Sequence, residues 1–420
     1  SKRKIDVWDM GAVQEADTSK YNNNITASDW DSCANVSQAG KFVAGETTFG
    51  DLTINHIAND RLFSTSSKNY GTNALATTAY DDGYTAGGMY YCNGTGGETR
   101  RNVTINNVIA GDKIVVYMAS SNAATGTLVF KYLGEDNEQV EKASFTNKGT
   151  KYEFVAKYSG SYKVYTDAAA GKPIYNRIVR IPGVAVSGTI DGAQLSGYKV
   201  MFKDEANGIT YDADIKGNTF TATLAAGCNY TAVLSGVAGY GFSNATKNIS
   251  TTVDEALTGK SGVTLSIEEK KVYTYTGKVT GFAADYDTSN LSVKLVADSS
   301  SLADDVILKL DSEKAFTATL EPDVKYTVEL IGVNDYEVLS GGEIISQVSY
   351  SRDIEVSARR LYKAAGKFAG LDGNTAVTDV KFTNVDDKYI YTGKVTTDGY
   401  EVMLRNGSYS IEAVADGYRT

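Results

Sequence analysis

Histidine is almost absent from this sequence, and the usual catalytic signatures are missing with it. The one histidine, His56, leaves no His-rich zinc site possible, and a Ser-His-Asp triad would need His56 as its base. His56 follows Leu52 and Ile54 at alternate positions, so a strand would place it beside them as a structural residue. No G-x-S-x-G, Walker or C-x-x-C motif occurs. We therefore predict a non-enzyme; the less favoured alternative is a β-sandwich lyase with Arg or Lys as its base.

Long apolar runs and clusters of basic residues are also lacking. No run of eighteen apolar residues occurs, and 51 Asp and Glu outnumber 41 Lys and Arg, which gives a net charge of −10. A membrane-spanning helix needs about 20 apolar residues, and a nucleic-acid surface needs clustered Lys and Arg. We therefore predict neither a membrane span nor a nucleic-acid partner. Residues Ser1 to Lys4 precede no apolar stretch, so we expect any signal peptide to have been removed or to lie before this sequence.

Methionine, proline and cysteine are scarce, at 5, 3 and 3 residues, whereas tyrosine and glycine number 29 and 41. With many Thr, Ser and Asn residues, this composition is typical of a β-rich extracellular protein. We expect a secreted or cell-surface protein and a monomer. Cys33 and Cys92 either pair as a disulfide or stay as buried thiols, and Cys228 stands alone further along the chain.

Short β-type runs separated by turn signals fill the first part of the chain. A strand is predicted around Val7 and Trp8, and the run from Lys113 to Ala119 has the continuous apolar character of a strand covered on both faces. No segment shows ten or more residues of helical periodicity. We predict an all-β jelly roll or β-sandwich over residues 1–183, with further strands at residues 47–56, 101–109, 126–133, 151–156, 160–167 and 173–181.

A repeat occupies the rest of the chain, which is too long for one core. The segments VSGTI, YTGKV and AAGKF place Gly188, Gly277 and Gly366 at a constant step of 89 residues. Each copy also contains a predicted β-hairpin with one tyrosine beside its turn, similar to the corner tyrosine of Ig-like sandwiches, and a second tyrosine that closes it. In chain order these pairs are Tyr230 and Tyr240, Tyr326 and Tyr336, and Tyr409 and Tyr418. We predict three tandem Ig-like β-sandwiches, at residues 184–271, 272–361 and 362–420.

The third repeat is shorter than the other two. In the first two repeats an alternating strand follows the closing tyrosine, SGVTLSIEEKK from Ser261 and SRDIEVSARR from Ser351, whereas the chain ends two residues after Tyr418. A sandwich without its last strand exposes an unpaired edge. We therefore expect this sequence to be a truncated piece of a longer polypeptide.

The segment from Tyr80 to Arg101, YDDGYTAGGMYYCNGTGGETRR, concentrates tyrosines, charges and glycines. Its glycine content favours loop and short strand over helix. Tyrosine rings suit the apolar face and hydroxyl rim of a sugar, and an arginine fork suits a sugar carboxylate. The alternative is that these tyrosines alternate in and out of a β-sandwich. The predicted carbohydrate-binding residues are Trp30, Tyr80, Tyr84, Tyr90, Tyr91, Arg100 and Arg101.

A structural calcium ion is the one metal or cofactor that the residues suggest. Carboxylate and amide oxygens and loop carbonyls are the ligands that calcium prefers. Several aspartates fall in predicted loops of the first 183 residues, although turn or surface roles are the alternative for each. The predicted metal ligands are Asp29, Asp31, Asp60 and Asp81.

Four stretches between residues 4 and 182 resemble the non-catalytic N-terminal regions of secreted pectate lyases and pectin methylesterases of gut clostridia: KIDVWDMGAVQEADTSKYNN, YDDGYTAGGMYYCNGTGGETRR, VIAGDKIVVYMA and GKPIYNRIVRIP. The repeats are similar to Ig-like or carboxypeptidase-regulatory-like modules found beside such catalytic domains. The resemblance implies a secreted multi-domain protein whose leading module holds a pectic polysaccharide. It carries over no catalytic residue, because the β-helix or esterase domain of those enzymes has no counterpart here, and it carries over no residue-level binding map.

Two functions follow from these observations. The main prediction is a non-catalytic region that binds pectin or polygalacturonate, followed by spacer modules of a larger secreted pectinolytic enzyme. Weak sites are adequate for this role because a polymer offers many sites in a row. The alternative is a purely structural extracellular stalk or surface-layer segment without a ligand, which the repeats favour.

Overall fold

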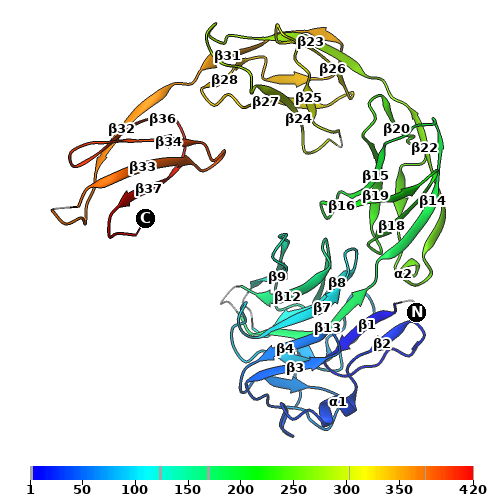
Figure 1. The fold of residues 1–420 in the computed structure, drawn as a ribbon. Helices are drawn as coiled ribbons and strands as arrows, with labels where there is room; N and C mark the ends of the chain where they lie inside the picture. The colour runs from blue at the N-terminus through cyan, green and yellow to red at the C-terminus, as the bar shows by residue number, and fades with distance from the viewer. Residues whose placement is uncertain (1–2, 123–124, 168–170, 302, 374, 420) are drawn as a thin grey trace. The chain divides into compact units, whose positions relative to one another are not determined.

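The regular secondary structure of the chain is almost entirely β-strand (Figure 1). The computed structural model describes residues 3–122, 125–167, 171–301, 303–373 and 375–419. Its strands form eight sheets, and its helices are short: α1 (Ala27–Asp31), η1 (Ala74–Thr77) and α2 (Glu255–Thr258). The predicted all-β fold of sandwich-like domains is confirmed. By their contacts, residues 1–268 and 269–420 form two compact units.

The first part of the chain, up to Ile181, is a sandwich of two sheets and is called the N-terminal module. The seven-stranded sheet has the order β11-β8-β13-β1-β2, with β6 on β13 and β5 on β6. Its strands are β1 (Ile5–Asp9), β2 (Tyr21–Asn23), β5 (Arg61–Phe63), β6 (Met89–Tyr91), β8 (Lys113–Ser120), β11 (Thr150–Val155) and β13 (Pro173–Ile181). The six-stranded sheet has the order β10-β9-β12-β7-β4-β3. Its strands are β3 (Gly45–Phe49), β4 (Leu52–His56), β7 (Asn102–Val108), β9 (Gly126–Tyr132), β10 (Val140–Phe145) and β12 (Gly160–Thr166).

The two central strands of the larger sheet are buried on both faces. Alternate residues of β8 enter different hydrophobic clusters: Ile114 and Val116 face the sandwich core, whereas Val115 and Tyr117 belong to a cluster on the outer face. Every residue of β8 and of β13 is buried. This confirms the prediction for the run from Lys113, because a strand that meets water on neither face has a continuous apolar sequence.

The structure departs from the predicted strands in several places, and the short strands β2 and β5 are not among those predicted. The run 47–56 is broken at Gly50, whose φ of +57° suits glycine in the turn between β3 and β4. Strand β10 is also missing from the predicted set, because its apolar residues, Val140, Ala143 and Phe145, do not alternate regularly with polar ones. His56 lies on β4 as predicted, with its ring nitrogens 2.8 Å from Thr47 Oγ1 and 2.6 Å from the Val43 carbonyl oxygen. Burial lowers the pKa of His56, so it is a neutral structural residue.

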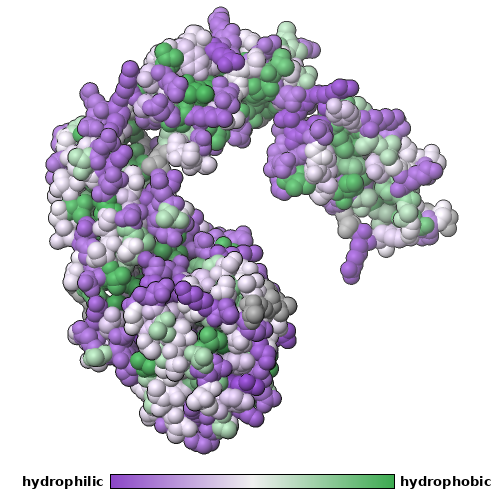
Figure 2. All heavy atoms as spheres, turned by 180° about the vertical axis from the view of Figure 1, so that it is seen from behind, coloured by the Kyte–Doolittle hydropathy of each residue, from purple (hydrophilic) through white to green (hydrophobic). Residues whose placement is uncertain are grey.

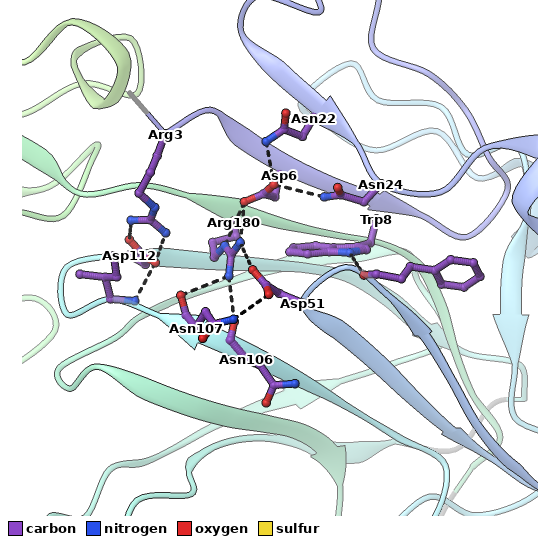
Figure 3. Close-up of polar contacts among 12 residues, drawn as sticks. Arg3, Asp6, Trp8, Asn22, Asn24, Asp51, Asn106, Asn107, Asp112 and Arg180 are labelled. Carbon is purple, nitrogen blue, oxygen red and sulfur yellow. Dashed lines mark hydrogen bonds and ion pairs between the residues drawn. The ribbon is translucent and has the colours of Figure 1, made fainter. Parts of the chain in front are cut away.

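Arg180 of β13 anchors a polar network at one edge of the module (Figure 3). Its guanidinium donates to Asp6 at 2.7 and 3.0 Å, to Asp51 at 2.8 Å and to the Asn106 carbonyl at 2.9 Å. It also lies 5.3 Å from the ring centre of Trp8. A buried cation requires partners of this kind. The network joins β13 to β1, to β7 and to the turn between β3 and β4.

Each repeat is a smaller sandwich of two sheets. Repeat 1 has the sheets β17-β18-β14-β22-β20 and β16-β15-β19-β21. Its strands are β14 (Val184–Gly192), β15 (Lys199–Asp204), β16 (Ile209–Asp212), β17 (Asp214–Lys216), β18 (Thr219–Leu224), β19 (Asn229–Ser235), β20 (Tyr240–Phe242), β21 (Asn248–Ser250) and β22 (Lys260–Glu269). Repeat 2 has the sheets β26-β23-β31-β28, with β30 also on β23, and β25-β24-β27-β29. Its strands are β23 (Tyr273–Thr280), β24 (Ser292–Ala297), β25 (Val306–Leu308), β26 (Ala315–Leu320), β27 (Lys325–Ile331), β28 (Tyr336–Ser340), β29 (Glu343–Ile345), β30 (Tyr350–Ser351) and β31 (Ile354–Ala358).

Repeat 3 has two three-stranded sheets, β32-β36-β35 and β34-β33-β37. Its strands are β32 (Leu361–Lys367), β33 (Val377–Asn384), β34 (Ile390–Thr392), β35 (Lys394–Val395), β36 (Gly399–Arg405) and β37 (Tyr409–Ala415). The tyrosine beside the hairpin turn ties that turn to the backbone in all three repeats, as predicted. A turn amide donates to the hydroxyl of Tyr230 at 2.8 Å and to that of Tyr326 at 3.3 Å. The hydroxyl of Tyr409 instead donates to the Arg405 carbonyl at 2.8 Å.

Candidate functional site

The predicted carbohydrate-binding residues do not form one surface. Trp30 and Tyr90 are completely buried, and Tyr91 is 8% exposed. The Trp30 indole donates to the Met10 carbonyl at 2.9 Å, and its ring packs edge-on against Phe49 with centroids 4.8 Å apart. A ring in the interior has no free face for a sugar. The predicted role of these three aromatic residues is therefore corrected: they belong to the core of the module.

Asp60, a predicted calcium ligand, is the hub of a closed polar cluster, which we call the Asp60 centre. Its buried carboxylate accepts from the Tyr90 hydroxyl at 2.7 Å, from Arg101 Nε at 2.8 Å, and from the Asn93 and Ile57 amides at 3.0 Å each. These four donors fill the acceptor sites of a carboxylate. The predictions that Asp60 binds calcium and that Arg101 pairs with a sugar carboxylate are both corrected, because the two side chains neutralise each other inside the protein.

The other predicted metal ligands lie in structural roles or at the surface. Asp29 caps α1 by accepting from the Thr26 amide at 2.8 Å, and Asp31 accepts from the Ser67 amide and hydroxyl at 3.0 and 2.5 Å. Asp81 is exposed. Within the described part of the chain, no group of three or more His, Cys, Asp or Glu side chains is placed to hold a metal ion. The calcium ion itself stays a prediction.

The segment 80–101 also holds the exposed Arg100 and a buried thiol. Arg100 is exposed, and its guanidinium donates to Thr95 Oγ1 at 3.3 Å. Cys92 is completely buried and is a free thiol, as are the partly buried Cys33 and the buried Cys228. Burial raises the pKa of the Cys92 thiol well above its usual value, which keeps it protonated and unreactive. The structure thus shows thiols at Cys33 and Cys92 rather than a disulfide.

Tyr80 and Tyr84 do come together, on the outer face of the seven-stranded sheet. Their rings stack with centroids 5.5 Å apart, and Tyr117 of β8 meets them edge-on at 5.0 and 5.1 Å. The Arg177 guanidinium lies 4.1 Å from the centre of the Tyr84 ring. Such cation–π and edge-to-face contacts contribute about 0.5–1.5 kcal/mol each beyond burial. We call Tyr80, Tyr84, Tyr117 and Arg177 the outer-face cluster.

Asp9 of β1 holds this cluster in place and forms what we call the Asp9 centre. Its carboxylate accepts from the Tyr84 hydroxyl at 2.7 Å and from two backbone amides at 3.0 and 3.1 Å, and it lies 3.4 Å from Arg177 Nε. Arg177 also pairs with Glu15 at 3.1 Å. Burial raises the pKa of Asp9, and its attraction to Arg177 and the hydrogen bond from Tyr84 only partly oppose that effect.

Tyr84, Tyr117 and Arg177 line a groove of about 520 Å³ on this outer face. Its apolar lining comes mainly from outward-facing residues of β1, β8 and β13, with Val13 and, from repeat 1, Val253. Its volume lies within the range of small-molecule sites. The ionisable lining consists of three carboxylates and two cations: Glu15, Asp82, Glu153, Lys151 and Arg177. Because carboxylates outnumber cations, the groove suits a neutral sugar better than a polyanion such as polygalacturonate.

The tyrosine hydroxyls of the groove already donate to carboxylates. Tyr117 donates to Asp82 at 2.6 Å, as Tyr84 does to Asp9. Burial acts to raise the pKa of Asp82, but the hydrogen bonds from Tyr117 and from the Tyr84 amide outweigh it and lower that pKa. Burial raises the pKa of both tyrosines, so they stay protonated donors. A ligand would therefore meet ring edges and hydroxyl lone pairs rather than free O–H groups.

Sequence reasoning missed Asp9, Tyr117 and Arg177, although one signal was available. Strand β13 carries Arg177 and Arg180 within the run PIYNRIVRI, which is otherwise almost entirely apolar. Because an arginine in a buried strand needs a carboxylate partner, two such residues indicate two ion pairs with other elements. Nothing in the sequence shows that the partners are Asp9 and Asp6 of β1, since strand pairing between β1 and β13 joins residues about 170 positions apart.

Comparison with known proteins finds no matching protein-family model and no matching curated protein. Among solved structures, the Bacillus anthracis TIE protein matches with 13% identity and a TM-score of 0.18, over 79% of this chain and 70% of that chain. The streptococcal ancillary pilin matches with 9% identity and a TM-score of 0.21, over 55% and 86%. The shaft pilin spaA from Lactobacillus rhamnosus GG matches with 12% identity and a TM-score of 0.21, over 43% and 99%. TM-scores this low carry no argument about function, and the resemblance to pectin-degrading enzymes stays a prediction.

Proposed function

We propose that this chain is a structural stalk segment of an extracellular protein, with tandem repeats as spacers and with the N-terminal module joined rigidly to repeat 1. The extracellular setting is supported by the composition, rich in Tyr, Thr, Asn and Gly and acidic overall. The rigid junction is supported by one observation above all: a single hydrophobic cluster runs from the module into repeat 1.

The shared cluster includes Val115 and Val155 on the outer face of the module and Val184 and Tyr211 of repeat 1. Only two residues separate β13 from β14. A flexibly tethered binding module has its own core and few contacts across its linker. Here the two domains cannot separate without exposing apolar side chains, at about 25 cal/mol for each Å² of apolar surface. A junction of this kind transmits force, which is what a stalk requires.

Polar contacts at the junction help to orient the module and repeat 1 but contribute little to the stability of the junction. The Tyr211 hydroxyl donates to the Ala156 carbonyl of the module at 3.2 Å. Lys20 pairs with Asp254 at 2.9 Å, but the side chain of Asp254 is 82% exposed, and solvated ion pairs of this type contribute little. The stability of the junction therefore comes mainly from the apolar cluster.

The junction is tested by Tyr211→Ala in the full chain. Hydrogen exchange would be measured on β8 and β11 of the module, which do not contain the substituted residue. We expect faster amide exchange in both strands, because removing a buried aromatic ring opens a cavity in the shared cluster and costs about 3–5 kcal/mol.

Val328→Ala is the matched control, since this residue lies in the core of repeat 2, outside the shared cluster. Val328→Ala should leave the rate of amide exchange in β8 and β11 unchanged. Unchanged exchange in the module of the Tyr211→Ala variant would mean that module and repeat fold independently, and the proposal of a rigid junction would fail.

A second function, polysaccharide binding by the module, is favoured by the groove beside Tyr84 and Tyr117. Its volume of about 520 Å³ and its aromatic lining suit a short stretch of sugar rings. The pectic polymer predicted from the sequence is the first ligand to test. The charge balance of the groove favours a neutral backbone over homogalacturonan.

The test is a pull-down of the full chain with homogalacturonan, rhamnogalacturonan, xylan and cellulose, with and without chelator. Tyr84→Ala should abolish retention on any polymer that binds in the groove, whereas the exposed Arg100→Ala, away from the groove lining, should not. Loss with chelator would support the predicted calcium ion. Retention on none of the four would leave the stalk as the function of this chain.

A further inference from the structure

The first and last strands of repeats 1 and 2 are neighbours that run in the same direction. In repeat 1, β14 pairs in parallel with β22, and in repeat 2, β23 pairs in parallel with β30 and β31. The chain enters each repeat at the start of its first strand and leaves at the end of its last strand, and it continues on both sides of each repeat. Entry and exit therefore lie at opposite ends of one set of paired strands, which we call the terminal pair of that repeat.

The parallel direction decides how tension acts on a terminal pair. Tension along the chain pulls the first strand backwards and the last strand forwards, so it slides the two strands past each other. The evenly spaced hydrogen bonds of a parallel pair share this load and must break together. Antiparallel neighbours such as β1 and β13 would instead open one bond after another if they were pulled at the end where Asp6 faces Arg180. A terminal pair therefore resists tension as a unit.

The glycine that recurs at a step of 89 residues lies inside the terminal pair. A Cβ on Gly188 would lie 1.9 Å from the Val263 carbonyl oxygen, and a Cβ on Gly277 would lie 2.0 Å from that of Arg352. No side chain fits at such a distance, so glycine is what lets the last strand approach the first. The recurring glycine is thus explained by the close pairing of the two strands that carry tension.

A second glycine lies at the other end of each terminal pair. A Cβ on Gly192 would lie 2.1 Å from the Ile267 carbonyl oxygen, and a Cβ on Gly281 would lie 2.0 Å from that of Val356. Both glycines have a positive φ, of +88° and +107°, which other residues rarely adopt. The close approach of the two strands therefore extends along the terminal pair in both repeats.

The terminal pair is continuous in repeat 1 and interrupted in repeat 2. Five successive residues of β14, from Gly188 to Gly192, are in register with β22. In repeat 2, Arg352 and Asp353 separate β30 from β31, and two residues are in register on each side of this break. Within the break the Arg352 amide still donates to a carbonyl of β23 at 2.8 Å, but the Lys278 amide donates to the exposed Asp353 carboxylate at 2.9 Å. A side chain therefore replaces one backbone partner.

Apolar side chains support both terminal pairs from the core. The buried Ile190 and Leu265 are directly opposite each other in repeat 1, as are the buried Val279 and Ile354 in repeat 2. The outer surface is more polar, and Figure 2 shows hydrophilic, purple atoms over much of repeat 2, at the top of that view. The support from the core is thus alike, and the two repeats differ in the continuity of their strand pairing.

We propose that repeats 1 and 2 are mechanical clamps of unequal strength, and that repeat 2 unfolds before repeat 1 under tension. The proposal rests on the proposed stalk function, which requires the chain to carry load. Unfolding of repeat 2 would lengthen the stalk by up to about 30 nm, because each extended residue spans about 3.5 Å. Repeat 1 would stay folded at that tension, so its rigid junction with the module would be preserved.

The test is single-molecule force spectroscopy of the full chain, held by handles at its two ends. Repeats 1 and 2 should each give an unfolding step of about 30 nm, since they have similar numbers of residues. The module, with more residues, gives a longer step, and repeat 3 gives a shorter one. We expect the steps of repeats 1 and 2 to occur at different forces, and the lower force to belong to repeat 2.

Moving one handle changes the direction of the load on repeat 1 without altering its terminal pair. The handle is attached at Gln194→Cys, an exposed residue just after β14, in a Cys33→Ser background because the other two thiols are buried. The second handle stays at the C-terminal end. Tension then acts on β14 and β22 at the same end and opens their bonds one after another. We expect the unfolding force of repeat 1 to fall below that of repeat 2, which is loaded as before.

Two matched variants test the break in the terminal pair of repeat 2. Asp353→Ala removes the acceptor of the Lys278 amide and should lower the unfolding force of repeat 2 alone. Asp298→Ala is the control, since this exposed aspartate also accepts from a backbone amide, that of Ser300 at 3.0 Å, but follows β24 in the other sheet. The control should leave the unfolding forces of both repeats unchanged.

Three outcomes would overturn the proposal. The first is an unfolding force of repeat 1 that is equal to or lower than that of repeat 2 when the chain is held at its ends. The second is an unfolding force of repeat 1 that does not change when the handle is moved to residue 194. The third is an equal effect of Asp353→Ala and Asp298→Ala. The rigid junction of the stalk is tested separately, by hydrogen exchange without load, so the two proposals can fail independently.

Discussion

Asp60 and Asp9 stand at the centre of two closely similar arrangements in the N-terminal module. Each carboxylate accepts a tyrosine hydroxyl at 2.7 Å and two backbone amides, and each pairs with one arginine. The Asp60 centre is closed inside the protein, whereas the tyrosine and arginine of the Asp9 centre line a groove. The same residue types thus form a structural hub in one place and part of a surface in the other, and the difference lies in what covers them.

The two centres also differ in the further partners of their arginines. Arg177 of the Asp9 centre has a second carboxylate, Glu15, at 3.1 Å. The further contact of Arg101 in the Asp60 centre is the neutral carbonyl of Thr95, at 3.2 Å. Loss of the central aspartate would therefore leave Arg101 without a carboxylate and Arg177 with one. This difference can be measured as stability.

The largest expected effect is that of Asp60→Ala. A buried arginine that loses its carboxylate costs about 3–5 kcal/mol, and we expect the free energy of unfolding of the module to fall by this amount. Asp9→Ala should cost less, about 1–3 kcal/mol, because Glu15 still neutralises Arg177. Urea unfolding followed by tryptophan fluorescence reports on the module directly, since both tryptophans, Trp8 and Trp30, lie in its core. Equal losses for the two variants would contradict the distinction between the centres.

A smaller effect is expected from removing one hydroxyl in each centre. Tyr90→Phe leaves Asp60 with an unmet acceptor in the interior and should cost about 1–3 kcal/mol. Tyr84→Phe removes a hydroxyl beside the groove, where water can replace it, and should cost about 0.5–1.5 kcal/mol. The same unfolding measurement applies. If Tyr84→Phe lowers the free energy of unfolding more than Tyr90→Phe does, the Asp9 centre is shielded from water better than the Asp60 centre.

The pH dependence of stability provides a third comparison. Burial raises the pKa of Asp9 above its ordinary value of 3.8, so between these two pKa values the folded module binds more protons than the unfolded one. The contribution of Asp9 is therefore fully present below pH 3.8 and is lost as the pH rises through the raised pKa. The stability difference between the parent chain and Asp9→Asn should shrink as the pH rises from about 3.5 to 7. A difference that grows with pH would mean that Arg177 lowers this pKa instead.

The smallest effect is expected at Arg100, the neighbour of Arg101 in sequence. Arg100 is exposed and contacts a threonine hydroxyl, so Arg100→Ala should change the free energy of unfolding by no more than about 0.5 kcal/mol. Arg101→Ala breaks a buried ion pair and should cost several times as much. Similar values for both variants would contradict the assignment of Arg101 to the interior.

Much of the fold could be predicted because it depends on local pattern. The buried strand from Lys113 has a continuous apolar sequence, and the corner tyrosines recur beside predicted turns. Strand β10 was not predicted, because most of its residues are partly or fully exposed. The run 47–56 was predicted as one strand, because a two-residue turn hardly changes the alternation of apolar residues. These errors are local, and they leave the architecture unchanged.

The candidate site was predicted less well, because its residues come from distant parts of the chain. The segment 80–101 does hold residues of the types found in binding sites. However, Tyr90 and Arg101 hydrogen-bond Asp60 in the interior, whereas Tyr84 hydrogen-bonds Asp9 on the outer face of the sheet. Residues of one short segment thus serve two different centres. Composition shows that such a segment contains many polar and aromatic side chains, but it does not show which of them are exposed to solvent.

By itself the sequence determined that this protein is all-β, that it contains three copies of one repeat, and that a tyrosine holds the turn in each. These properties follow from periodicity and turn chemistry, which act over a few residues. Only the tertiary structure decided that Asp60 is closed off and that Arg177 borders a groove. Burial and strand pairing are relations between residues far apart in the chain, and the free energy of a charge or a backbone amide depends on those relations.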